Sequence, residues 1–75
     1  MVEFSTDNKE TLNRMAKKFN SKGIQYCFLS IGRKEVGRVT TYYVTMVIKS
    51  KKYNDEGMLL TLLQDFSDIT VHRLE

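Results

Sequence analysis

The sequence contains no proline, a single cysteine and a single histidine. One cysteine excludes an intramolecular disulfide, and such low cysteine usage is typical of a cytoplasmic protein. Without proline or a Ser/Gly-rich tract there is no candidate linker, and 75 residues suit one small hydrophobic core. We therefore expect one compact domain over residues 1–75.

Long apolar runs and a strong charge imbalance are also missing. Apolar stretches such as Met58-Leu59-Leu60 are much shorter than the roughly 20 residues of a membrane-spanning helix. The N-terminal residues lack the basic and apolar regions of a signal peptide. The 12 Lys and Arg residues against 9 Asp and Glu residues give a net charge of +3. This excess is too small to favour a polyanion, so we predict a soluble domain with no nucleic-acid partner.

Side chains suited to catalysis or metal binding are scarce. An enzyme usually needs a nucleophile beside a base or a pair of carboxylates, whereas a lone histidine in a predicted strand, such as His72, is more often a surface residue. Cys27 is interpreted as a small buried apolar residue. The run Asn54-Asp55-Glu56 is explained by helix capping and lacks the spaced oxygens of a cation site. We predict no catalytic residue, no cofactor and no metal site, and we do not expect an enzyme.

Two segments have the apolar spacing of amphipathic helices. In the first, the positions i, i+3, i+4 and i+7 are Leu12, Met15, Ala16 and Phe19. Asp7 is the predicted N-cap, in a capping box with Glu10. Gly23 is suited to a left-handed helix end, after which Ile24 can contact the helix. The pattern predicts a helix over about residues 8–21.

In the second helix the same four positions are Leu59, Leu62, Leu63 and Phe66. Asn54 is its predicted N-cap. Asp65 and Asp68 are interpreted as residues that terminate it. Each helix therefore has one apolar side, which must pack against another element.

Two runs rich in β-branched and aromatic residues, 24–31 and 39–48, lie between the helices and predict a hairpin. The charged segment Gly32–Arg38 between them is predicted to be its loop. One alternate set in the second run is wholly apolar and is expected to face the helices; it consists of Tyr42, Val44, Met46 and Ile48. Short strands at residues 2–5 and 69–74 complete the order β-α-β-β-α-β.

That order predicts an α+β ferredoxin-like sandwich, a four-stranded antiparallel sheet with both helices on one face. The second and fourth strands are expected at its edges. If Cys27, Leu29 and Ile31 point towards the helices, the neighbouring aromatic residues lie on the open face of the sheet. The candidate interaction face then consists of Tyr26, Phe28, Tyr43 and Val47.

This face has two interpretations, and each assigns it a different binding partner. In RNA recognition motifs, aromatic residues of the central strands stack on bases, and segment 37–43, Gly-Arg-Val-Thr-Thr-Tyr-Tyr, is a loose counterpart of their signature. Exposed aromatic and aliphatic surface is more often buried against a second copy or a neighbouring domain. We favour the second interpretation, which is self-association or contact with a fused domain.

The order of elements and the closing segment 59–74, a leucine-rich helix, a short turn and a strand, resemble ACT-like regulatory domains. Within that group, the long second and third strands and the charged hairpin Arg33-Lys34-Glu35 are most similar to the C-terminal cytosolic domain of MgtC/SapB-type bacterial inner-membrane proteins. Amino-acid-binding ACT domains usually carry an acidic residue, a proline or similar, and then a glycine in the turn after the first strand. This chain has Asp7-Asn8-Lys9-Glu10-Thr11-Leu12 there, which departs from that ligand-binding pattern.

The resemblance implies a non-catalytic regulatory or assembly domain at the cytosolic face of the inner membrane, as part of a longer protein. It implies a link to magnesium homeostasis that belongs mainly to the membrane part, and association as a homodimer or contact with that part. Two alternatives stay open: a stand-alone ACT-type sensor of a small molecule, and an RNA-binding ferredoxin-like module.

Overall fold

The computed structural model describes residues 1–53 and 55–74. Along these residues the chain forms β1 (Val2–Thr6), α1 (Glu10–Ser21), β2 (Tyr26–Val36), β3 (Val39–Ile48), the short 3₁₀ helix η1 (Lys51–Tyr53), α2 (Glu56–Leu63) and β4 (Ile69–Leu74). The sheet order is β2-β3-β1-β4, and neighbouring strands are antiparallel. The predicted α+β ferredoxin-like fold is therefore confirmed, with β2 and β4 at the edges.

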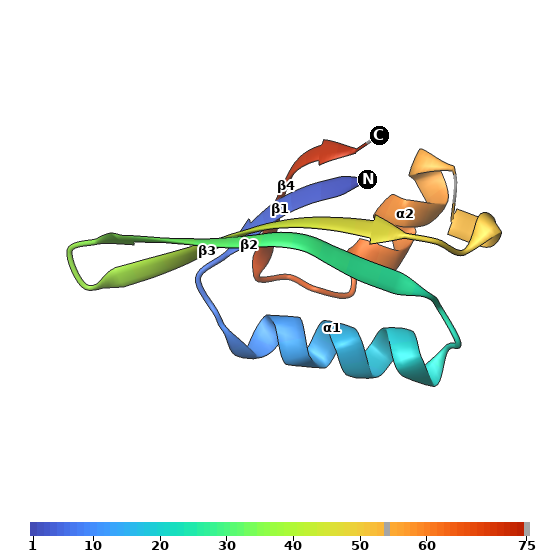
Figure 1. Cartoon of the computed structure of the whole chain (residues 1–75), viewed down its shortest axis with the longest axis horizontal. Coiled ribbons are helices and arrows are strands. Elements are labelled where there is room, and N and C mark those ends of the chain that lie inside the picture. Colours follow the sequence, from blue (N-terminus) through green and yellow to red (C-terminus); the bar gives the residue numbers. More distant parts are fainter. Residues whose placement is uncertain (54, 75) are drawn as a thin grey trace.

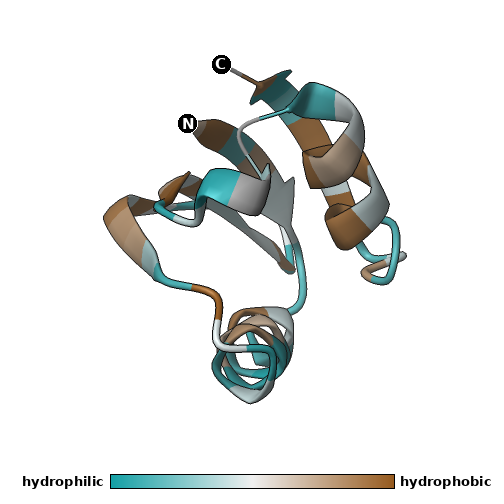
Figure 2. Ribbon diagram, turned by 90° about the vertical axis from the view of Figure 1, so that its right-hand side faces the viewer, coloured by the Kyte–Doolittle hydropathy of each residue, from teal (hydrophilic) through white to brown (hydrophobic). Residues whose placement is uncertain are grey.

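Both helices cover the same face of the sheet (Figure 1), and the view with α1 seen end-on places α2 beside it (Figure 2). The hydrophobic core lies between the helices and the sheet. Its buried side chains are Val2, Phe4, Met15, Phe19, Ile24, Val44, Met46, Ile48, Leu59, Leu62, Leu63 and Phe66. The opposite face of the sheet carries no second layer in the part of the chain that is described, so we call it the open face.

The C-terminal end of α1 is a Schellman motif. Gly23 has a φ of +68°, and its N–H donates to the carbonyl of Asn20. The N–H of Ile24 donates to the carbonyl of Phe19 at 2.9 Å. These are the two hydrogen bonds of the motif, and only glycine adopts the left-handed conformation at little cost. The predicted end of this helix is confirmed.

The predicted capping box at the start of α1 is wrong. The helix begins after Lys9, whose side chain forms no capping bond, and Asp7 is exposed. The carbonyl oxygen of the Asn8 side chain instead accepts the N–H of Glu10 at 3.0 Å. The N–H of Asn8 donates to the hydroxyl of Thr6 at 3.1 Å. Asn and Asp are about equally suited to this role, so local turn geometry decides which one takes it.

The apolar side of α2 is as predicted, but the helix is shorter than its spacing indicates. Leu59, Leu62 and Leu63 are buried, and the helix ends at Leu63. Phe66 lies in the turn beyond it, where its N–H donates to the carbonyl of Leu63 and its side chain remains in the core. The predicted N-cap, Asn54, lies outside the described residues.

The hairpin is longer than predicted. Residues 32–36, expected in a loop, belong to β2 and pair with residues 39–43 of β3. The turn is reduced to Gly37-Arg38, in which Gly37 has a φ of +63° and Arg38 does not have a positive φ. This φ pattern is that of a type II′ turn, which needs glycine only at its first position and matches the twist of the flanking strands. The strands can therefore run up to the turn.

The first half of β2 has its faces reversed relative to the prediction. Tyr26 and Phe28 pair with buried residues of β3 and pack against the core. The ring of Tyr26 lies 5.3 Å from that of Phe19 in α1. Cys27, expected to be buried, is exposed. Two aromatic rings remove more apolar surface from water than a cysteine and a leucine do, so this orientation is the more stable one.

A bulge then changes the orientation of β2. The register with β3 shifts between Phe28 and Ser30, which leaves Leu29 as an extra residue. Beyond the bulge Ile31 pairs with Val44 on the side of the helices, as predicted. It is nevertheless 51% exposed, because the hairpin continues past the helices (Figure 1).

Candidate functional site

The open face keeps two of the four residues predicted to form an interaction surface. Tyr43 is 46% exposed on β3, and Val47 on the same strand is half-buried. Tyr26 and Phe28 lie on the other face, where their ring centroids are 5.5 Å apart. The structure therefore does not assemble the predicted aromatic face, and the RNA interpretation loses two of its three rings.

A second bulge brings His72 over the open face. The pairing of β1 with β4 shifts by one residue there and leaves His72 as the extra residue of β4. Its Nε2 lies 2.7 Å from the hydroxyl oxygen of Ser5 on β1. Its ring is stacked towards that of Tyr43 on β3, with centroids 6.3 Å apart and planes at 27°. Three strands thus contribute to one polar and aromatic cluster, which the sequence alone did not reveal.

Ser5 and His72 place a hydroxyl group beside an imidazole nitrogen, which is the contact that activates the nucleophile of serine hydrolases. Catalysis by such a pair also uses an acidic group that orients the imidazole and donors for the developing oxyanion. Among the described residues no carboxylate is hydrogen-bonded to His72, and Ser5 is only 8% exposed. We interpret the Ser5–His72 hydrogen bond as a structural contact that links β1 to β4.

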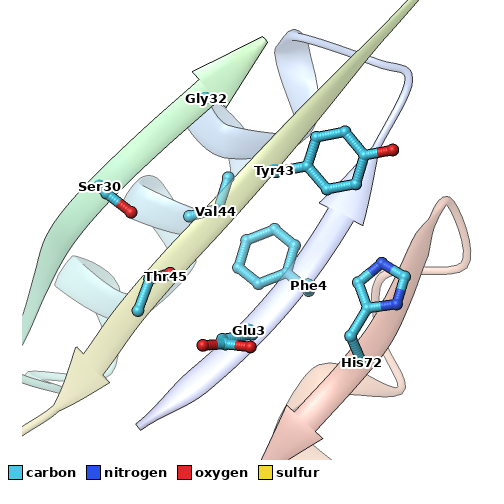
Figure 3. A pocket seen from close by; sticks show the side chains of 8 residues that line it. All are labelled: Glu3, Phe4, Ser30, Gly32, Tyr43, Val44, Thr45 and His72. Atoms are coloured by element: carbon cyan, nitrogen blue, oxygen red, sulfur yellow. The ribbon is translucent and has the colours of Figure 1, made fainter. Parts of the chain in front are cut away.

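The same cluster forms one side of a shallow cavity of about 420 Å³ on the open face (Figure 3). Its lining residues are Glu3, Phe4, Ser30, Gly32, Tyr43, Val44, Thr45 and His72. They come from all four strands, so the cavity runs across the sheet. Its volume lies within the range of small-molecule sites, roughly 300–1,000 Å³.

The walls of this cavity differ in chemistry. Glu3, from the central strand β1, supplies a half-buried carboxylate, and Ser30 and Thr45 supply hydroxyl groups. Gly32 stands opposite Tyr43 in the sheet. Because glycine has no side chain, the space beside the tyrosine ring stays open.

At the far end of β1, Asp68 holds the segment before β4 against the start of α1. Its carboxylate accepts hydrogen bonds from the hydroxyl of Thr11 and from the side-chain amide of Asn8, and it forms an ion pair with Arg14 at 2.6 Å. The hydroxyl of Thr6 donates to its backbone carbonyl at 2.9 Å. The polar groups of the β1–α1 turn are therefore bonded to one another.

The two aspartates predicted to terminate α2 instead form contacts with α1. Asp65 forms an ion pair with Lys18 of α1, and Asp68 bonds to the first turn of the same helix. Both join the segment between α2 and β4 to α1 at the surface of the protein. The polar groups of the turn after β1 are correspondingly engaged in internal contacts.

The hydrogen bond from Thr11 is the largest of the causes that lower the pKa of Asp68 below its usual value of 3.8; a backbone hydrogen bond and the charge of Arg14 act in the same direction, and burial opposes them. A carboxylate with a lower pKa in the folded chain stabilises the fold above the unfolded pKa, and this stabilisation is lost as the pH falls through the folded pKa. We expect Asp68→Asn to lower the free energy of unfolding by about 1–2 kcal/mol at neutral pH. The difference from wild type should shrink as the pH falls below 3.8 and through the lowered pKa of Asp68. Urea titrations across this pH range measure both.

Asp7→Asn is the matched control, since Asp7 is exposed and was the cap expected from the sequence. Its free energy of unfolding should stay close to that of wild type at every pH. A larger loss for Asp7→Asn than for Asp68→Asn would contradict the capping arrangement described above.

The end of the hairpin is the other exposed region of note. Residues 29–39 are all exposed, and they project beyond the helices (Figure 1). We call them the hairpin arm. Its large apolar side chains, each more than half exposed, are Leu29, Ile31, Val36 and Val39. The arm also carries Arg33, Lys34, Glu35 and Arg38.

The described residues hold no group of three or more His, Cys, Asp or Glu side chains placed to bind a metal ion. None of the helices they form has the length and apolar content needed to cross a lipid bilayer.

Fold and surface together define a ferredoxin-like α+β domain with an uncovered sheet face and a projecting hairpin. No family model, curated protein or solved structure matches the chain.

Proposed function

We propose that the chain is a non-catalytic regulatory or assembly domain that associates with a second copy through its hairpin arm. The observation that supports this most is the set of four apolar side chains on the arm, each more than half exposed. Single exposed apolar residues are common on protein surfaces, but a group of them on one projecting element is typical of a contact surface. Burial of this group against another chain is favourable.

A second copy is the favoured partner because β2 is an edge strand of 11 residues. Its outer edge presents backbone N–H and C=O groups with which another extended segment can pair. The bulge at Leu29 interrupts the edge, which leaves residues 30–36 as its regular part. The same segment of a second molecule, running antiparallel, offers the matching groups and brings the two arms together.

The wider assignment is also a proposal. On the resemblance described above, the domain is ACT-like and most similar to the cytosolic C-terminal domain of MgtC/SapB-type membrane proteins, where it would assist assembly next to the membrane part. The long β2 and β3 and the charged hairpin are consistent with this. The link to magnesium would then belong mainly to the membrane part. Transmembrane helices encoded upstream of Met1 are the observation that tests it.

The two alternatives have less support. A sensor that binds its ligand at the β1–α1 turn would compete with the bonds among Thr6, Asn8 and Asp68. An RNA platform would have Tyr43 but neither Tyr26 nor Phe28 on the open face.

Sedimentation velocity over a wide range of concentration tests the association. We expect the wild-type chain to form a dimer reversibly as concentration rises. The double variant Val36→Lys, Val39→Lys should stay monomeric, because it places two desolvated charges at the contact. Circular dichroism and thermal unfolding verify that the variant folds; the two positions are exposed and face each other across the hairpin, so the fold should tolerate lysine there.

The matched control is the double variant Asn13→Lys, Asn20→Lys, which adds the same charge on exposed positions of α1. It should dimerise like wild type. A wild-type chain that remains monomeric at the highest concentration, or a dimer unaffected by the two arm lysines, would count against the proposal.

A further inference from the structure

We propose that the cavity on the open face binds a small organic amine, with its positive charge at Glu3 and its apolar or aromatic body along Tyr43 and His72. The cavity adjoins the hairpin arm, since Ser30 and Gly32 line it, but none of the four apolar arm residues does. The inference rests on the open face of the sheet, whereas the proposed dimer uses the outer edge of β2 and the apolar arm residues.

Charge is the first argument for an amine. Among the described residues that line the cavity, Glu3 is the one with a formal charge at neutral pH. Glu3 is a half-buried residue, and no ion pair joins its carboxylate to another described residue. A carboxylate that is partly removed from water is stabilised by a nearby cation, and the low dielectric of the concave surface strengthens that attraction. In a chain with a net charge of +3, the cavity is thus a local site for cations.

The aromatic rings are the second argument. Tyr43 and His72 lie in nearly parallel planes, 27° apart, with their centroids separated by 6.3 Å. The face of a tyrosine ring attracts ammonium groups, and it also stacks on planar apolar groups. Figure 3 shows Glu3 on β1 between the side chains from β3 and β4. An amine placed at Glu3 is therefore within reach of both rings.

The third argument is the space and polarity beside the rings. Ser30 and Thr45 offer hydroxyl oxygens that can accept further N–H groups of the ammonium. Gly32 leaves the cavity open next to Tyr43: a Cβ added there would meet only the backbone oxygen of Tyr43, at 3.9 Å. A larger residue at this position would therefore fit the fold but fill the cavity.

Amide NMR titration with 2-phenylethylamine tests the proposal, and phenylacetate serves as a probe with the same ring and the opposite charge. We expect saturable shifts for the amine at residues 3, 30, 43, 45 and 72, and no saturable shifts for phenylacetate. Glu3→Gln should weaken amine binding by about tenfold or more, since it removes the charge and keeps the shape. Gly32→Val should weaken it to a similar extent by occupying the space.

Glu10→Gln is the control, because Glu10 is exposed at the start of α1 and does not line the cavity. It should bind the amine like wild type, as should the arm variant Val36→Lys, Val39→Lys. The proposal is overturned if the amine gives no saturable shifts, if phenylacetate binds as well as the amine, or if Glu3→Gln leaves the affinity unchanged.

Discussion

Replacing Phe19 with alanine is expected to lower the free energy of unfolding by about 3–5 kcal/mol. Phe19 is fully buried, and its ring makes edge-to-face contacts with Tyr26 at 5.3 Å and Phe66 at 6.4 Å. It therefore joins α1, β2 and the turn after α2. A chain of this length has a total stability on the order of 4–11 kcal/mol, so this single change should remove a large share of it.

Urea denaturation followed by circular dichroism measures the effect. Leu60→Ala is the matched control, because Leu60 is an apolar residue that is 43% exposed on α2; it should cost less than about 1 kcal/mol. Similar losses for the two variants would contradict the placement of Phe19 at the centre of the core.

The helices and the fold were predictable because their signals are local. The apolar side of α1 and the glycine after it depend only on residues near one another in the sequence. Gly23, at a φ of +68°, adopts the conformation that the Schellman pattern predicts. The order of elements then limits the topology, since right-handed crossovers leave few ways to arrange the four strands.

The orientation of β2 was not predictable in the same way. Both alternate sets at its start are apolar, one with Tyr26 and Phe28 and the other with Cys27 and Leu29, so alternation alone does not choose between them. The choice depends on contact with Phe19 of α1. The bulge at Leu29 shifts the alternation of β2 by one residue. Tyr26 and Phe28 therefore face the helices on one side of the bulge, and Ile31 faces them on the other.

The length of the hairpin was underestimated for a different reason. Gly32 and Gly37 both look like loop residues in the sequence, but only Gly37 has a positive φ. Gly32 sits inside β2, opposite Tyr43. A glycine within a strand is often a place where the surface must stay open, which fits its position beside the cavity.

The cluster on the open face depends on contacts between distant parts of the chain. Ser5 and His72 are 67 residues apart in the sequence, and a bulge in β4 decides where the imidazole lies. No local motif marks either residue. The sequence carries one weaker signal, since His72 alternates with Val71 in the predicted last strand and is typical of a surface residue.

Helices that cover one face of the sheet leave two neighbouring surfaces for other molecules. The hairpin arm offers an edge and apolar side chains, and the cavity offers a carboxylate beside two rings. Both depend on how β2 is oriented, because Ser30 and Gly32 of this strand line the cavity and residues 29–36 of the arm belong to it. The orientation of β2, with Tyr26 inward and Cys27 outward, is therefore the central claim.

Cys27 provides a direct probe of that claim, because it is the only cysteine. In the native protein at low concentration we expect a thiol reagent to modify it at a rate within about tenfold of the unfolded chain, since the side chain is exposed. The matched control is Met46→Cys in a Cys27→Ala background. Met46 is fully buried on β3, so its replacement should react only through unfolding, more slowly by a factor on the order of 10³ or more.

The rate of Cys27 modification under native conditions is thus the most direct test. Fast modification of Cys27 together with protection at position 46 is the result expected from the structure. Protection of Cys27 comparable to that at position 46 would place it in the core, with Tyr26 and Phe28 on the open face, and would contradict both the packing and the surfaces inferred from it.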